Sequence, residues 1–97
     1  MKIETLMELS DWRKKIDELD RELVRLLNER ARCAVEIAKI KRRKGLPILE
    51  SNREQEVMQH AFDANEGPLP DQAIQRILER IVEEGKTLQK RVFEEKQ

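Results

Sequence analysis

The chain has 97 residues, of which 38% are hydrophobic, 41% are charged and only 3% are aromatic. This length allows at most one domain, and a lean apolar core under an ionic surface is typical of long helices. Twenty basic residues balance twenty acidic residues, which excludes a general electrostatic affinity for nucleic acid or for anionic membranes.

The first predicted element is one unbroken amphipathic helix over residues 10–44. We expect Ser10 to be its N-cap, residues 1–9 to be a frayed lead-in, and Gly45 to end it in the left-handed conformation. Its apolar residues recur at steps of three and four, which places them on one face of a helix: Ile16, Leu19, Leu23, Leu26 and Ile37.

The length of this helix predicts the assembly. Thirty-five helical residues make a rod of about 50 Å, whereas a compact globule of this chain length is about 30 to 35 Å across. One copy of the chain therefore cannot bury the apolar stripe. An intertwined homodimer is the economical solution.

A short second helix is predicted over residues 52–64. Ser51 and Glu54 fit a capping box, in which each side chain satisfies a backbone N–H at the start of a helix. The inward face of this helix is predicted to carry Glu54, Val57, Met58, Ala61 and Phe62.

A third helix is predicted over residues 70–93, after turn-forming residues 65–70. Gly85 and Gln89 interrupt its apolar stripe, which consists of Ile74, Ile77, Leu78, Ile81, Val82, Leu88 and Val92. Strand signals are absent. We therefore expect an all-α fold with three helices per chain (long, short and medium) in a single domain, residues 1–97, intertwined into a homodimeric bundle.

Two cations occupy apolar positions of the long helix. Continuing the stripe beyond Leu26 leads to Arg30 and then to Lys41, which lie eleven residues apart on nearly the same face, about 16 Å apart along the axis. Each of these two cations also has an interpretation without a functional role, in which the side chain extends to solvent from the edge of the stripe. Arg53 and Glu54 on the second helix and Gln89 on the third add further polar groups. Together they suit a small dianion that carries a hydroxyl group.

Other chemistries have weaker support in the sequence. His60 has no Ser, Cys and Asp arrangement around it, and we interpret it as a solvated surface residue. Cys33 and His60 lack the spacing of zinc ligands, so no metal site is predicted. The basic run over residues 39–44 has no interleaved aromatic residues and reads as a solvated helix end. With one cysteine, no signal peptide and no apolar run long enough to span a membrane, a cytoplasmic protein is expected.

Several segments in this order and spacing resemble the all-helical chorismate mutases. The segments that carry the resemblance are Arg13, residues 26–30 (LLNER), residues 34–41 (AVEIAKIK), Pro47 and Ile48, residues 52–54 (NRE), and Leu88 and Gln89. The resemblance covers about Leu9 to Arg91. It implies an intertwined dimer with two active sites that catalyses the Claisen rearrangement of chorismate to prephenate in aromatic amino acid biosynthesis, without a cofactor.

The resemblance also implies a role for each matching residue. Arg30, with Arg13 from the partner chain, would hold the two carboxylates of the substrate. Lys41 and Gln89 would address the ether oxygen, Glu54 the ring hydroxyl, and Arg53 would support the pocket.

Two positions depart from the family pattern. Glu50 stands where an aspartate is often found, and its backbone N–H remains able to contribute. Gly85 stands where a small hydroxyl residue is often found, so one carboxylate contact is missing. A glycine within a helix costs about 1 kcal/mol, which points to close packing or ligand approach at this position.

Three alternatives remain open from the sequence. An isochorismate pyruvate lyase shares the fold and a similar cationic pocket. A non-enzymatic helical dimerisation module would leave Arg30, Lys41 and Gln89 solvated or paired with each other. A DNA-binding dimer would lose affinity steeply as salt rises.

Overall fold

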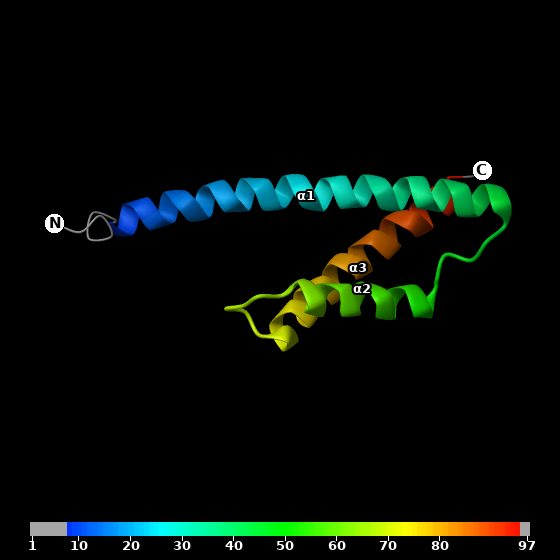
Figure 1. Ribbon diagram of the computed structural model, residues 1–97. Coiled ribbons are helices and arrows are strands. Elements are labelled where there is room, and N and C mark those ends of the chain that lie inside the picture. The colour runs from blue at the N-terminus through cyan, green and yellow to red at the C-terminus, as the bar shows by residue number, and fades with distance from the viewer. Residues whose placement is uncertain (1–7, 96–97) are drawn as a thin grey trace. The chain divides into compact units, whose positions relative to one another are not determined.

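The computed structural model describes residues 8–95, which form three α-helices joined by two short connections (Figure 1). Helix α1 spans Leu9–Lys44, α2 spans Ser51–Ala64 and α3 spans Asp71–Glu94. No strand occurs among these described residues. The predicted all-α class is confirmed, and every predicted helix boundary lies within one residue of the observed one. Of the predicted lead-in, residues 1–7 lie outside the described part of the chain.

The two ends of α1 are closed by local contacts. The carbonyl of Glu8 accepts the first backbone hydrogen bonds, and its N–H donates to the Asp11 carboxylate at 2.9 Å. The prediction of Ser10 as N-cap is therefore wrong, because Asp11 already satisfies a backbone donor one residue before the helix. At the other end Gly45 has a φ of +71°, and Leu46 N–H donates to the Lys41 carbonyl at 2.8 Å. This is a Schellman cap, which confirms the expected left-handed Gly45.

Helix α2 begins without a side-chain cap. Its N-cap is Glu50, which makes no capping hydrogen bond with its side chain. The predicted capping box of Ser51 and Glu54 is wrong, because the Glu54 carboxylate pairs with Lys86 of α3 instead of turning back to the backbone. An ion pair between two helices has thus replaced a local contact.

The connection between α2 and α3 is organised by one side chain. The Asn65 amide donates to the Leu69 carbonyl at 2.9 Å and to the Asp71 carboxylate at 2.8 Å, and its oxygen accepts the Gly67 N–H at 3.1 Å. Gly67 has a φ of +75°, a conformation that glycine adopts without steric cost. These contacts confirm the predicted turn.

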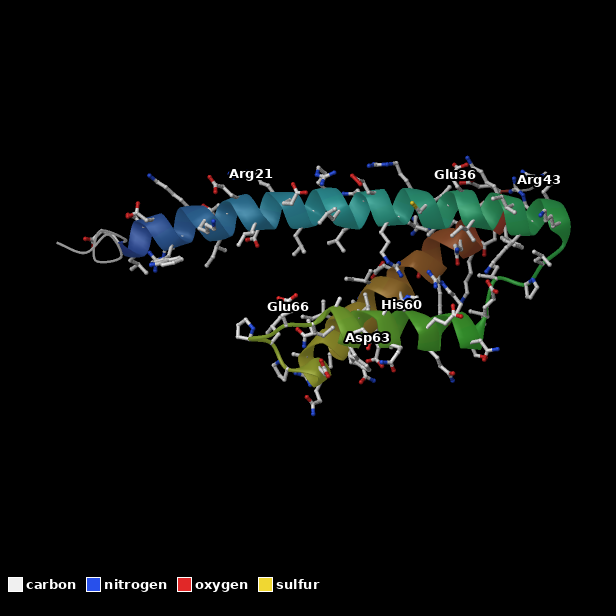
Figure 2. The ribbon with its side chains drawn as sticks, in the orientation of Figure 1. Arg21, Glu36, Arg43, His60, Asp63 and Glu66 are labelled. Carbon is white, nitrogen blue, oxygen red and sulfur yellow. The ribbon has the colours of Figure 1, made fainter. Side chains whose placement is uncertain are left out.

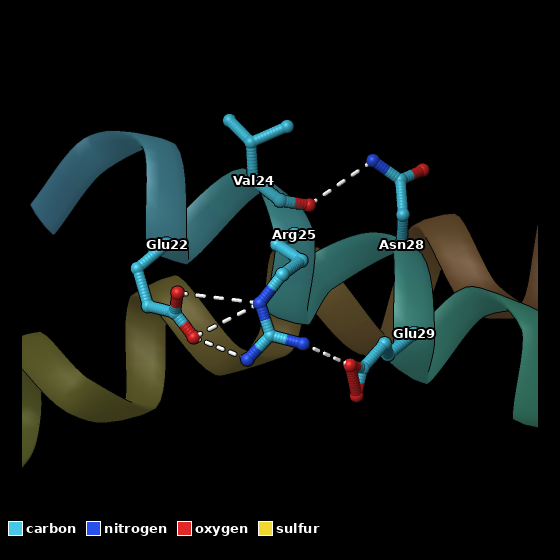
Figure 3. Close-up of polar contacts among 5 residues, drawn as sticks. All are labelled: Glu22, Val24, Arg25, Asn28 and Glu29. Carbon is cyan, nitrogen blue, oxygen red and sulfur yellow. Dashed lines mark hydrogen bonds and ion pairs between the residues drawn. The ribbon is translucent and has the colours of Figure 1, made fainter. Parts of the chain in front are cut away.

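The chain divides into two units between Arg30 and Ala31. The described part of the N-terminal unit consists of Glu8 and the first part of α1, which has an exposed apolar stripe. Trp12, Ile16, Leu19, Leu23 and Leu26 are each between 48% and 58% exposed. On the polar surface, the Arg25 guanidinium joins Glu22 and Glu29, and the Asn28 amide donates to the Val24 carbonyl at 3.0 Å (Figure 3).

The C-terminal unit consists of the rest of α1 together with α2 and α3. Helix α3 crosses α2, and its C-terminal end lies beside the last part of α1 (Figure 1), where the Arg42 guanidinium donates to the Val92 carbonyl. The residues buried in this unit are Ala34, Ala38, Lys41, Gly85 and Val92.

The predicted inward face of α2 is confirmed, since all five of its residues are half-buried. The predicted stripe of α3 is half-buried or buried except at Ile77, which is 53% exposed.

Candidate active site

Lys41 is the most deeply buried charge in the described residues. Only 11% of its side chain is exposed, and it lies in the last turn of α1. Its Nζ lies 2.6 Å from Glu50 Oε1 and donates to the Ile48 carbonyl at 2.9 Å. The Schellman cap at Gly45 turns the chain so that residues 46–50 return to this ammonium. An ammonium has three donors, so these two acceptors hold it in place and leave one N–H to act on a ligand.

Glu50 is the counterion of Lys41 and faces solvent. Its side chain is 52% exposed. The hydrogen bond from Lys41 and, next, the positive charge of that lysine lower the pKa of the Glu50 carboxyl below its ordinary value. Glu50 is therefore ionised at neutral pH, and the burial of Lys41 is balanced by a carboxylate at its side.

Gln89 reaches from α3 to the backbone of α1. Its side chain is half-buried, and Nε2 donates to the Ala34 carbonyl at 3.1 Å. An amide nitrogen carries two donor hydrogens, so this contact orients the group and leaves the second N–H. Gly85, one turn earlier on α3, is buried. The site therefore contains no side chain at the position where a hydroxyl residue was expected from the family pattern.

Glu54 and Lys86 line an open cavity of about 540 Å³ between α2 and α3. Glu54 Oε2 lies 2.8 Å from Lys86 Nζ, and the side chains are 39% and 25% exposed. A hydrogen bond to Glu54 raises the pKa of the Lys86 ammonium, against a smaller opposing effect of burial. Apolar side chains of both helices complete the wall, among them Met58, Phe62 and Val82.

Of the three predicted arginines, Arg13 and Arg30 belong to the N-terminal unit and Arg53 to the C-terminal unit. Arg53 is 58% exposed and pairs with Glu56 on its own helix at 3.3 Å. Arg13 is exposed and Arg30 is half-buried, and neither forms an ion pair within the described residues 8–30. The roles predicted for Arg13, Arg30 and Arg53 therefore stay predictions.

Sequence reasoning missed Lys86. It lies four residues after Val82 and three before Gln89, so it occupies an apolar position of the α3 stripe in the same way that Arg30 and Lys41 do on α1. The spacing of three and four residues along α3 was therefore enough to identify Lys86 as a cation at an apolar position. A half-buried cation at such a position calls for a partner, and the structure supplies Glu54.

The remaining polar candidates are surface residues. His60 on α2 is exposed, as predicted (Figure 2). In the basic run at the end of α1, Arg43 points away from α2 and α3 (Figure 2). Lys39 in the same run pairs with Glu36 at 3.1 Å. Cys33 is exposed. Within residues 8–95, no three potential metal ligands are grouped closely enough to bind an ion.

Comparison with known proteins identifies the family. The sequence profile of the chorismate mutase type II family matches residues 12–90. The chain belongs to this family. The match includes Lys41, Glu50, Glu54, Lys86 and Gln89, and it confirms the resemblance seen in the sequence.

Individual relatives agree with this assignment. A chorismate mutase of Methanocaldococcus jannaschii is 34% identical over 93% of this chain and 92% of its own length. A bifunctional chorismate mutase/prephenate dehydratase of Aquifex aeolicus is 37% identical over 88% of this chain, which spans only 25% of that relative. This type II family chain thus corresponds to about a quarter of the bifunctional relative and to nearly all of the M. jannaschii protein.

The fold agrees as well. A chorismate mutase structure from Thermus thermophilus superposes with a TM-score of 0.84 at 34% identity, over 86% of this chain and 94% of the other. The three-helix architecture is therefore that of the type II chorismate mutase family. None of the described helices is long and apolar enough to cross a membrane.

Proposed function

We propose that the protein is a chorismate mutase that converts chorismate to prephenate by an intramolecular Claisen rearrangement. Family membership supports this activity, and so does the M. jannaschii relative, which carries that name and matches over most of both chains. The structural observation that carries the proposal is the buried ammonium of Lys41, which two acceptors fix in place while one N–H remains.

The two fixed donors account for the chemistry. As the C–O bond of chorismate breaks, negative charge grows on the ether oxygen, and donors already in place stabilise it without reorganisation. Lys41 supplies a cation, and Gln89 supplies an amide N–H that needs no proton from solvent. Their own contacts with Glu50, Ile48 and Ala34 hold both groups before the substrate arrives. The reaction involves no covalent intermediate and no cofactor, so positioning and electrostatics suffice.

The other family residues would bind the substrate. Arg30 and Arg13 of the partner subunit would each hold a carboxylate, because a guanidinium matches a carboxylate with two parallel donors. Glu54 would accept the ring hydroxyl, and Arg53 would support the pocket from the start of α2. Gly85 offers no donor, so one carboxylate would bind with one contact fewer.

The proposed active form is a homodimer in the cytoplasm. Five large apolar side chains of the N-terminal unit are about half exposed in the single chain: Trp12, Ile16, Leu19, Leu23 and Leu26. Burying one such side chain fully contributes about 1.5 to 3 kcal/mol, so a second copy that covers the stripe is strongly favoured. The dimer would also bring Arg13 of the partner subunit to a site that its own chain does not complete.

Loss of chorismate absorbance, with prephenate identified as the product, tests the proposed activity. Wild-type protein should turn chorismate over, and Arg30→Ala should reduce kcat/KM by about a hundredfold or more. Arg32→Ala is the matched control, since Arg32 is exposed on the same helix and has no proposed role. If chorismate is untouched while isochorismate yields pyruvate, the protein is a lyase. Inactivity with both substrates would contradict an enzyme of this family.

A further inference from the structure

The Lys86 ammonium selects a partner on another helix. Glu83, one turn earlier on α3, also lies in the cavity wall and offers a local carboxylate. Lys86 Nζ nevertheless lies 2.8 Å from Glu54 Oε2 of α2. Both residues line the 540 Å³ cavity, so the pair lies at a ligand-sized opening.

The pair leaves one carboxylate oxygen of Glu54 available. Lys86 holds Oε2, and Oε1 has no hydrogen-bond or ion-pair partner among residues 8–95. A free glutamate side chain samples many rotamers, and a ligand that binds it must order them. A glutamate already held by a half-buried cation avoids this loss when the ligand arrives.

From this geometry we propose that Lys86 is a positioning residue, which orients the Glu54 carboxylate so that its second oxygen accepts the ring hydroxyl of chorismate. The inference rests on the proposed mutase activity and deepens it. Lys86 acts through Glu54 and does not contact the substrate. Its effect lies in substrate affinity, because the hydroxyl contact exists both in the bound substrate and in the transition state.

Two other roles predict different results. A lysine that bound the substrate directly would matter whether or not Glu54 were present. A lysine that only joined α2 to α3 would change the stability or the fraction of active protein, and hence the apparent kcat, without a specific change in KM. A double-mutant cycle with separate kcat and KM values distinguishes these roles.

The variants are Lys86→Met, Lys86→Arg, Glu54→Gln and the Lys86→Met/Glu54→Gln double variant, assayed with chorismate as full-length chains. Lys86→Met should raise KM by about tenfold, the equivalent of one charge-assisted hydrogen bond, and leave kcat nearly unchanged. Lys86→Arg should restore most of the affinity, because it keeps the cation. In the Glu54→Gln background, Lys86→Met should cause no further rise in KM.

Lys90→Met is the matched control, since Lys90 lies one turn further along α3 and is exposed. It should behave like wild type. An unchanged KM in Lys86→Met with an active wild type would overturn the inference alone. So would a full additional loss in the Glu54→Gln background, or a fall in kcat with unchanged KM. A wild type that does not convert chorismate would overturn both this inference and the proposed function.

Discussion

The two units of the chain pair their charges differently. In the N-terminal unit, Arg25 bridges Glu22 and Glu29, three and four residues away on the same exposed helix surface (Figure 3). The C-terminal unit also has such local pairs, but it adds pairs between elements: Lys41 with Glu50, and Lys86 with Glu54. Local pairs support a helix whether or not it packs against anything. Pairs between elements exist only when the unit is folded, and both of them involve predicted site residues: Lys41 and Glu50 in one, Glu54 in the other.

The two units also differ in how far they bury their apolar residues. The stripe of the N-terminal unit is exposed from Trp12 to Leu26, whereas the C-terminal unit buries Ala34, Ala38 and Val92. A helix with a regular but uncovered stripe is built to be completed by another surface. We therefore infer that the first part of α1 serves assembly, while the second part holds groups of the candidate site.

The largest expected effect comes from a charge in the exposed stripe. Leu23→Asp should weaken the proposed dimer by about a hundredfold or more, because it would remove apolar surface from the proposed interface and place a carboxylate there. Chorismate turnover should fall with it. Sedimentation at micromolar concentration measures the first effect and the absorbance assay the second.

Arg21→Asp is the control for this variant, because Arg21 lies about half a turn away from Leu23 on the polar side of α1 (Figure 2). It should leave the dimer intact. A Leu23→Asp protein that remains a fully active dimer would show that the stripe is not the interface, and the contrast between the two units would fail.

Lys41→Leu should remove activity while the chain stays folded. Loss of the fixed cation should lower kcat by about 10²- to 10³-fold. Removing one partner of an ion pair lowers stability, but the remaining Glu50 is half exposed and can be solvated, so the loss should be too small to unfold the chain. The chorismate absorbance assay measures kcat, and circular dichroism shows whether the chain is folded. Lys39→Leu, which removes only an exposed pair with Glu36, should retain activity.

Glu50→Gln should alter the pH dependence of stability. In the folded protein, Lys41 lowers the pKa of the Glu50 carboxyl below its ordinary value of 4.5. The Lys41 pair therefore stabilises the fold at pH values above this ordinary pKa. The contribution is lost as pH falls through the lowered folded pKa. The urea concentration at half unfolding should therefore be higher for the wild type than for Glu50→Gln at neutral pH. This difference between the two proteins should disappear in acid. A difference that persists unchanged at about pH 2 would contradict the ion pair.

The smallest effect is expected for Arg25→Ala. Exposed pairs on one helix contribute little to stability and are screened by salt. The thermal midpoint should fall slightly at low ionic strength and match wild type at high salt, with chorismate turnover unchanged. A large loss of activity would place Arg25 in the site and would erase the distinction between local and long-range pairs.

Much of the fold could be predicted because its signals are local. The helix ends near Lys44 and Ala64 follow from a cap glycine and a turn, and the inward face of α2 follows from its periodicity. Lys41 and Gln89 were found because each breaks an apolar stripe. The capping box at Ser51 failed for a different reason. Glu54 had two possible partners, and only packing brought Lys86 close enough to compete with the backbone.

The sequence by itself determined three helices, where they end, their apolar faces and the polar residues that interrupt those faces. All of these depend on residues a few positions apart, whose geometry a helix sets. Only the tertiary structure decided that Lys41 pairs with Glu50, that Lys86 holds Glu54 and that Gln89 reaches the Ala34 carbonyl. The physical reason is that a chain with twenty acidic and twenty basic residues offers each charge many partners. The choice among them depends on how the helices pack.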